Sequence, residues 1–146
     1  MHIATKGSKI DISSEKKLEE FSKNFCTNLK LGDIFFLIGD IGIGKTTFVK
    51  YIINHLQFKF KQKFTEVTSP TFNIMNEYVI DNYLIKHYDL FRLNSSKDLQ
   101  NLDLFDESHK AILFIEWPQI IKKKPNKVTE LYFEYENEYQ NRFIKF

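Results

Sequence analysis

The chain has 146 residues, 42% of them hydrophobic and 27% charged, which suits one folded domain and excludes disordered or low-complexity architecture. A net charge of +2 is too small to indicate nucleic-acid binding by itself, and a single cysteine excludes an internal disulfide. Only Arg92 and Arg142 among the 21 basic residues are arginines, which excludes a cage of arginines around a phosphate group.

The sequence pattern of residues 2–38 predicts an N-terminal arm, a helix and a buried strand, in that order. Residues 2–12 have the pattern of a short strand or an irregular arm. A helix is expected after a serine cap at Ser13 or Ser14, and Gly32 stands where a glycine usually ends a helix. Residues 34–38 are continuously apolar, as in a strand buried on both faces of a parallel sheet. This longest apolar run is too short to cross a bilayer and nothing resembles a signal peptide, so we expect a cytoplasmic location.

The second half of the chain predicts mainly strands. The expected elements are two strands joined by a tight turn, a short helix, a fully apolar strand and a final hairpin, at residues 72–80, 83–89, 95–104, 111–116, 128–135 and 142–146. Strands and helices alternate first and a hairpin comes last, which predicts an α/β fold whose sheet includes antiparallel strands.

Residues 58–64, Phe-Lys-Phe-Lys-Gln-Lys-Phe, alternate aromatic and basic side chains. One interpretation is an amphipathic edge strand or loop with solvated lysines. The other is a contact for RNA, in which the rings stack on bases and the lysines meet phosphates. The pattern leaves both interpretations open.

A phosphate-binding loop lies between the buried strand and an amphipathic helix expected over residues 45–56. The segment from Gly39 to Thr46 fits G-x-x-x-x-G-K-[ST] at every fixed position. Its glycines let backbone N–H groups wrap the β-phosphate, and the start of the helix adds the positive end of its dipole. Lys45 would reach the β- and γ-phosphates, the Thr46 hydroxyl would bind Mg²⁺, and Thr47 would touch the α-phosphate. The expected nucleotide-binding residues are Gly39, Asp40, Ile41, Gly42, Ile43, Gly44, Lys45, Thr46 and Thr47.

Two later strands end in an acid that could serve the metal ion beside this loop. Glu116 ends residues 111–116, which is the Walker B pattern, and Asp89 ends a less apolar strand. Either carboxylate could bind Mg²⁺ directly or through water, and Glu116 could also orient the attacking water. A helix cap or a plain surface acid is the alternative for each. Trp117 follows Glu116 and could either pack in the core or cover the nucleotide site.

Residues 68–72, Thr-Ser-Pro-Thr-Phe, occupy the position of the mobile loop in GTPase-like proteins, whose threonine senses the γ-phosphate and Mg²⁺. A simple turn with Pro70 at its second position is the alternative. Residues 126–129 lack the aspartate with which an Asn-Lys-x-Asp motif reads guanine. ATP is therefore the expected nucleotide.

Four segments, in this order, resemble the bacterial TsaE family, also called YjeE. They are the P-loop segment 39–48, residues 67–78 with Ser-Pro-Thr-Phe, residues 87–93 with His-Tyr-Asp-Leu-Phe-Arg, and residues 115–118 with Glu-Trp-Pro. Many unrelated proteins share the P-loop, whereas the other three elements together are specific. The resemblance spans essentially the whole chain. It implies one P-loop ATPase domain over residues 1–146, a three-layer sandwich whose mixed central sheet, with antiparallel strands, is flanked by helices.

The resemblance also implies a function, namely ATP hydrolysis in the biosynthesis of threonylcarbamoyladenosine in tRNA. Lys45 and Thr46 would bind phosphate and Mg²⁺. The remainder of the implied site comprises the switch-like Thr71, the metal-side carboxylate Asp89, and Glu116 with Trp117. The implied partner is a complex of TsaB and TsaD, which links the protein to tRNA indirectly and which ATP hydrolysis resets between turnovers. Neither a membrane nor DNA is an expected partner.

Two other functions fit a P-loop domain of this size. A small nucleoside or metabolite kinase is disfavoured, because such kinases close an arginine-rich lid over the transferred phosphate. An ATP-gated binding module would use nucleotide binding without hydrolysis as its signal. The sequence offers no evident arginine finger in the same chain apart from the candidate Arg92, so we expect slow hydrolysis that a partner accelerates.

Overall fold

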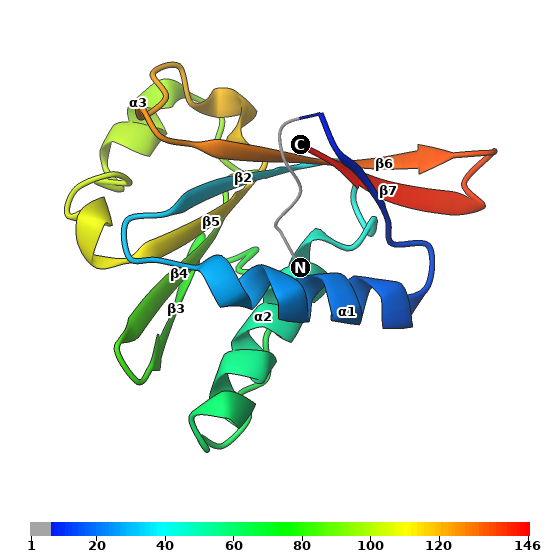
Figure 1. Ribbon diagram of the computed structural model, residues 1–146. Coiled ribbons are helices and arrows are strands. Elements are labelled where there is room, and N and C mark those ends of the chain that lie inside the picture. Colours follow the sequence, from blue (N-terminus) through cyan, green and yellow to red (C-terminus); the bar gives the residue numbers. More distant parts are fainter. Residues whose placement is uncertain (1–6) are drawn as a thin grey trace.

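A mixed β-sheet of seven strands forms the centre of the structure over residues 7–146, the part of the chain that this computed structural model describes (Figure 1). The strands are β1 (Lys9–Asp11), β2 (Ile34–Ile38), β3 (Met75–Ile80), β4 (Tyr83–Asp89), β5 (Ile112–Glu116), β6 (Thr129–Glu136) and β7 (Asn141–Lys145). Their order across the sheet is β1-β7-β6-β2-β5-β4-β3. The start of the expected arm, at residues 2–6, lies outside the described residues, and its end forms β1.

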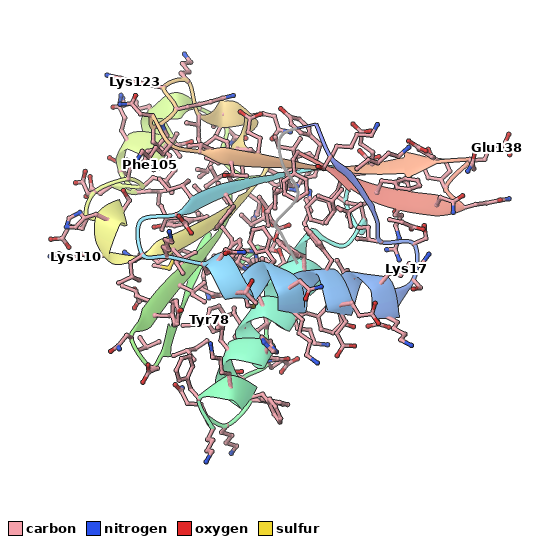
Figure 2. The ribbon with its side chains drawn as sticks, viewed as in Figure 1. Lys17, Tyr78, Phe105, Lys110, Lys123 and Glu138 are labelled. Atoms are coloured by element: carbon pink, nitrogen blue, oxygen red, sulfur yellow. The ribbon has the colours of Figure 1, made fainter. Side chains whose placement is uncertain are left out.

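Parallel pairing holds the middle of the sheet, and antiparallel pairing completes both sides. β2 pairs in parallel with β5 and with β6, and β4 pairs in parallel with β5. β3 and β4 are antiparallel because a two-residue turn joins them, with Asp81 at φ +50° as such turns require. The hairpin of β6 and β7 is also antiparallel and projects from the sheet, with Glu138 near its tip (Figure 2). The predicted α/β fold with a mixed sheet is confirmed.

Helices and turns cover both faces of the sheet (Figure 1). The two longer helices, α1 (Glu15–Phe25) and α2 (Lys45–Lys59), lie on one face. The short helix α3 (Ser96–Gln100), the loops around it and the 3₁₀ turn at Pro118–Ile120 lie on the other. Sheet and coverings make the three layers expected from the sequence.

The continuous apolar runs reflect this double coverage. In β2, Phe35 and Leu37 join the cluster under α1 and α2, whereas Ile34 and Phe36 join the cluster on the opposite face. Both faces of β2 are shielded from water. A strand that alternated apolar and polar residues there would therefore bury polar side chains in one of the two cores. Phe48 on α2 is fully buried among other aromatic rings, and burial of such a side chain contributes about 2–3 kcal/mol.

The prediction of the first helix was right at its start and wrong at its end. Ser14 caps α1, because its side-chain oxygen accepts a hydrogen bond from the Lys17 N–H. The helix ends at Phe25, and the chain tightens into a 3₁₀ turn at Cys26–Asn28. Gly32 belongs to the following turn, where its φ is +98° and its N–H donates to the Ala111 carbonyl.

Three other element boundaries differ from the predictions by three residues or more, and the last three strands differ by one residue. Helix α2 continues past Leu56 to Lys59, and no edge strand forms over residues 58–64. Strand β3 begins at Met75 rather than Phe72, because the Ile74 N–H donates to the Pro70 carbonyl and closes a turn there. Helix α3 ends at Gln100, short of the expected residue 104.

Candidate functional site

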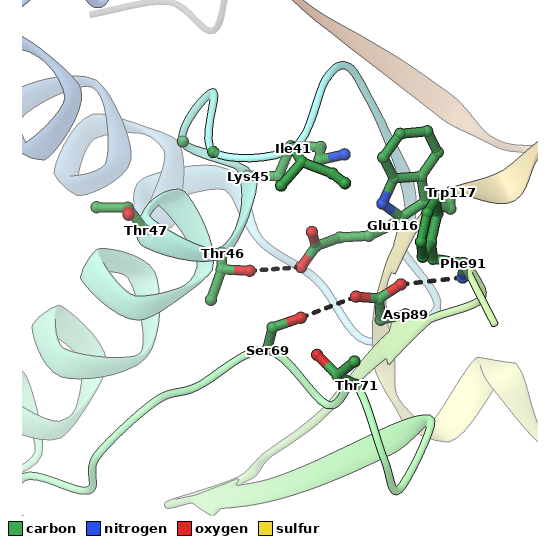
Figure 3. Close-up of a pocket in the computed structure, with 12 residues that line it drawn as sticks. Ile41, Lys45, Thr46, Thr47, Ser69, Thr71, Asp89, Phe91, Glu116 and Trp117 are labelled. Carbon is green, nitrogen blue, oxygen red and sulfur yellow. Dashed lines mark hydrogen bonds between the residues drawn. The ribbon is translucent and has the colours of Figure 1, made fainter.

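A cleft of about 360 Å³ lies at the carboxyl ends of the parallel strands, where the loop after β2 meets the start of α2 (Figure 3). Ligands bind at this edge in open α/β sheets because loops and helix N-termini converge there. The described residues that line the cleft are Ile41, Gly42, Gly44, Lys45, Thr46, Thr47, Ser69, Thr71, Asp89, Phe91, Glu116 and Trp117.

The loop between β2 and α2 depends on its glycines and on one arginine. A Cβ atom at Gly39 would lie 2.7 Å from the carbonyl oxygen of Phe133 on β6, so only glycine fits that close approach. Gly42 lines the cleft with φ +78°, a backbone conformation that glycine adopts readily and L side chains rarely do. The Arg142 guanidinium on β7 donates from Nη1 to the Ile43 carbonyl over 3.3 Å and ties the loop to the sheet.

Lys45 is held inside the wall of the cleft. Its ammonium group donates to the Gly39 carbonyl and lies 3.9 Å from the centre of the Trp117 ring. Burial lowers the pKa of Lys45, and the carboxylates of Glu116, Asp89 and Asp40 oppose that shift. A buried ammonium group that faces the open space of a cleft is suited to binding an anion.

Glu116 connects the start of α2 to the sheet. Its Oε2 accepts a hydrogen bond of 2.8 Å from the Thr46 hydroxyl and lies 2.6 Å from Nε2 of His87 (Figure 3 shows the first bond). Since a carboxylate oxygen accepts, Nε2 of His87 is the donor in this contact. Glu116 is 3% exposed and His87 is fully buried. The orientation of the carboxylate is therefore set from two sides.

Asp89 is the neighbour of Glu116 across paired strands. The two residues are register partners on β4 and β5. Asp89 accepts hydrogen bonds from the Ser69 hydroxyl over 2.8 Å and from the Phe91 N–H over 3.0 Å. Ser69 thus brings the loop that carries Thr71 against the carboxylate (Figure 3).

Trp117 covers the cleft from a strained backbone position. Its φ of +56° and ψ of +55° are left-handed, which is unfavourable for a bulky residue and more so directly before Pro118. Its ring lies 4.9 Å from the ring of Phe91. Of the two interpretations of this tryptophan, the structure supports the cover over the cleft.

Comparison with known proteins identifies the family. The family described as "Threonylcarbamoyl adenosine biosynthesis protein TsaE" matches residues 12–144. The chain belongs to the TsaE family. The resemblance inferred from the four motifs is confirmed.

Curated relatives and a solved structure agree with this assignment. A Rickettsia typhi protein named "tRNA threonylcarbamoyladenosine biosynthesis protein TsaE" is 40% identical over 111 residues, which cover 76% of this chain and 74% of the relative. A Borreliella burgdorferi protein of the same name is 39% identical over 114 residues, covering 76% and 78%. The crystal structure of Bacillus subtilis YdiB superimposes with a TM-score of 0.70 over 98% of this chain and 86% of that one, at 23% identity. This likeness confirms the P-loop NTPase-like fold.

Most of the site residues predicted from the sequence of this TsaE-family member line the same cleft. Three of them do not. Gly39, Asp40 and Ile43 border a second depression between the loop and the β6–β7 hairpin. The Ile43 side chain is 1% exposed and belongs to the core. Thr47 lines the cleft but points away from the carboxylates (Figure 3).

The sequence predicted no role for several other residues around the cleft. His87, Ser69 and Phe91 stood inside recognised motifs, but their contacts with the two carboxylates depend on strand pairing. Arg142 had no local signal at all. Arg92, considered as an arginine finger, lies outside the lining residues with its guanidinium 5.1 Å from the Phe72 ring centre.

The donor atoms of the cleft suit a magnesium ion that also binds phosphate. The Thr46 hydroxyl and the carboxylates of Asp89 and Glu116 are hard oxygen ligands, which Mg²⁺ prefers and softer metals do not. Within residues 7–146, no group of three or more His, Cys, Asp or Glu residues could hold a metal ion. The remaining ligands would be water and phosphate oxygens, as is usual for Mg²⁺.

Residues 7–146 hold no helix long and apolar enough to cross a membrane.

Proposed function

We propose that this protein is a Mg²⁺-dependent ATPase in the threonylcarbamoyladenosine modification of tRNA. The observation that carries the proposal is the Thr46 hydroxyl at the start of α2, hydrogen-bonded to Glu116 in the cleft that Lys45 and Asp89 also line. Membership of the TsaE family supports the tRNA-modification role. We further propose that residues 1–146 act as one domain, in the cytoplasm.

The loop and Lys45 bind the phosphates of ATP in this proposal. The N–H groups at the start of α2 and around Gly42 point at the phosphate chain, and the helix dipole favours its negative charge. The Lys45 ammonium leaves the Gly39 carbonyl and the Trp117 ring for the β- and γ-phosphates. Its burial strengthens that attraction, because less water screens the charge.

Thr46, Asp89 and Glu116 hold the metal ion, and Thr71 approaches it from the loop that Ser69 anchors. A bound Mg²⁺ offsets the charge that develops on the transferred phosphoryl group. Glu116 orients the attacking water through the oxygen that is free of Thr46, with its own position maintained by His87. Trp117 shields the reacting groups from bulk water.

Hydrolysis depends on a partner in this proposal. No arginine lies among the described residues that line the cleft, so stabilisation of the transition-state charge is incomplete in the isolated chain. A TsaB–TsaD complex supplies the missing contacts, and hydrolysis resets that complex between rounds of modification. In this proposal the TsaB–TsaD complex links the chain to tRNA during modification.

The proposal is tested by reconstituting tRNA modification from purified TsaB, TsaD and the enzyme that makes their substrate. With this protein present, product is expected to accumulate over many turnovers, and without it accumulation is expected to stop after about one. The variant Glu116→Gln should bind ATP, hydrolyse it at least about 100-fold more slowly and fail to support turnover. Glu107→Gln, an exposed acid away from the cleft, is the matched control.

Three results would contradict the proposal. The first is fast hydrolysis by the isolated chain that TsaB and TsaD leave unchanged. The second is full multiple-turnover modification without this protein. The third is full support of turnover by Glu116→Gln despite lost hydrolysis, because ATP binding alone would then be the signal.

A further inference from the structure

A groove of about 320 Å³ lies on the outer side of α1 and α2, toward the end of α2 that is farthest from the nucleotide cleft. We call it the aromatic–lysine groove. Its described lining residues are Glu19, Lys23, Tyr51, Asn54, His55, Phe58 and Phe64. The groove and the cleft share no lining residue, and on α2 the groove begins at Tyr51, about 9 Å along the helix from Lys45 at the cleft.

Two aromatic rings of this groove are exposed to solvent. Phe58 is 72% exposed and Phe64 is 60% exposed. They come from the segment that alternates aromatic and basic residues, but Phe60 in the same segment is half-buried against the ring of Tyr83. The structure thus separates one anchoring ring from two rings that face water.

Hydrogen bonds hold the segment that carries Phe64 against the β3–β4 turn and α2. Gln62 reaches the β3–β4 turn, where its amide donates to the Val79 carbonyl and accepts from the Asp81 N–H. After Phe64, the N–H of Thr65 donates to the Gln57 side chain on α2. The segment is therefore presented in a fixed conformation, which lowers the entropic cost of binding through its rings.

The charge beside the groove is positive along residues 58–65, whereas Glu15 and Glu19 lie on the α1 side, where Glu15 accepts a hydrogen bond from the Tyr51 hydroxyl. Lys59, Lys61 and Lys63 are exposed, and none of them forms an ion pair with a residue in the described range. Burial and the nearby charges of Lys23 and Lys59 lower the pKa of His55. Glu19 is the acid among the described lining residues, and no acid occurs from Phe58 to Thr65. The side of the groove formed by residues 58–65 is therefore complementary to an anionic ligand.

We propose that the aromatic–lysine groove binds single-stranded RNA, with bases stacked on Phe58 and Phe64 and phosphates near Lys59, Lys61 and Lys63. Exposed rings beside unpaired cations are the combination that binds unpaired nucleotides without reading their sequence. A protein partner fits less well, because lysine is depleted at the centres of protein interfaces. The inference goes beyond the proposed ATPase and does not depend on hydrolysis, since the groove and the cleft are separate.

The test measures binding of a fluorescent oligouridine of about ten nucleotides to the full chain by anisotropy, over a range of salt concentrations. The double variant Phe58→Ala/Phe64→Ala is expected to weaken binding at least about tenfold. Lys61→Gln/Lys63→Gln is expected to reduce the slope of log affinity against log salt by roughly 0.7 for each lysine that meets a phosphate. An RNA duplex of the same length should bind more weakly than the single strand.

Matched controls come from other exposed residues of the same types. Tyr139→Ala removes a ring that is 75% exposed, and Lys122→Gln/Lys123→Gln removes two exposed lysines. Lys123 lies at the opposite end of the molecule from the end of α2 (Figure 2). ATP binding is measured on every variant and should not change, which keeps this test separate from that of the ATPase.

The proposal is overturned if oligouridine shows no salt-dependent binding, or if the groove variants bind it as well as the unaltered chain. Equal weakening by the control pairs would show diffuse attraction to lysines and would also overturn it. Unchanged RNA binding together with a weakened complex with TsaB and TsaD would assign the groove to a protein partner.

Discussion

Trp117 brings together a strained backbone, a buried cation and the cover of the cleft. Its left-handed conformation costs on the order of 1–2 kcal/mol, and such strain is retained chiefly where the surroundings impose it. The strain turns the indole ring over Lys45 instead of letting it pack beneath β5. We expect a ring in that position to contact a nucleotide bound in the cleft.

Because Trp117 is the only tryptophan of the chain, its fluorescence should report on nucleotide binding. We expect ATP with Mg²⁺ to change the emission in a saturable way, since the Lys45 ammonium leaves the ring for the phosphates. Lys45→Ala should abolish the change, and Trp117→Ala should weaken ATP binding roughly tenfold when a labelled nucleotide is the probe. Emission that ATP leaves unaltered would place the ring outside the binding site.

His87 is a positioning residue for Glu116, because it is fully buried and touches the carboxylate rather than open cleft space. Its Nδ1 has no hydrogen-bond partner among the described residues, so its Nε2 contact is what the ring contributes. His87→Phe keeps the ring volume and removes the donor. We expect kcat to fall about tenfold with little change in ATP affinity, and the melting temperature to fall by a few degrees.

Single-turnover hydrolysis, nucleotide binding and thermal unfolding of His87→Phe separate these effects. His109→Phe, at an exposed position, should leave all three unchanged. A loss of ATP affinity equal to the loss of kcat would show that His87 shapes the whole cleft rather than Glu116 alone.

At the scale of elements, the P-loop is held by parts of the chain that are distant in sequence. Arg142 on β7 donates to the Ile43 carbonyl and, over 3.4 Å, to the Ser13 carbonyl just before α1. One guanidinium therefore joins the loop, the first helix and the hairpin. Its planar fork reaches two carbonyls at once, which a single ammonium group does less well.

Arg142→Lys keeps the charge but loses the fork, and we expect ATP affinity to fall about tenfold as the loop loosens. Global stability should change by less than about 1 kcal/mol, because the side chain is only half-buried. Isothermal titration and thermal unfolding measure the two quantities. Arg92→Lys is the comparison, and an equal loss of affinity there would contradict a specific role for Arg142.

Cys26, between α1 and α2, gives the packing of these helices a pH dependence. Burial raises the pKa of the thiol to about 12, so the folded state favours the protonated form. A raised folded-state pKa means that this stabilisation is complete below the ordinary value of 9.0 and is lost as pH rises toward 12. The thiol should stay unreactive toward Ellman's reagent at about pH 8 until the chain is unfolded in guanidinium chloride.

The Cys26→Ala variant should lose less stability than the unaltered chain between neutral and strongly alkaline pH. Fast labelling of the folded protein would show instead that α1 and α2 separate readily.

At the scale of the whole molecule, the cleft is assembled from the P-loop, α2, the ends of β4 and β5, and the loop at Ser69. A ligand that contacts all of them stabilises the folded state against unfolding. At about 100 times its dissociation constant, ATP with Mg²⁺ should add about 2.7 kcal/mol to the free energy of unfolding. Thermal shift measures this, EDTA should reverse most of it, and Asp89→Asn/Glu116→Gln should lose the dependence on Mg²⁺. The same shift with EDTA present would contradict a metal held by these carboxylates.

The sequence alone determined those features whose parts are contiguous. The motif has every required residue between Gly39 and Thr46, directly after an apolar strand, so the proposed phosphate binding and the place of the loop on a parallel sheet follow from local pattern. Glu116 ends an apolar strand and Asp89 ends a less apolar one, which also follows from the local pattern. Element boundaries were less predictable, because hydrogen bonds such as the one from Ile74 to Pro70 decide where a strand can begin.

Only the tertiary structure decided which side chains meet. His87 lies 29 residues from Glu116, and Ser69 lies 20 residues from Asp89. These contacts arise from the register of β4 against β5 and from the path of one loop, and no local pattern encodes either. The exposure of Phe58 and Phe64 beside buried Phe60 has the same origin. A pattern of alternation shows that rings and lysines are present, but packing decides which of them remain free to bind.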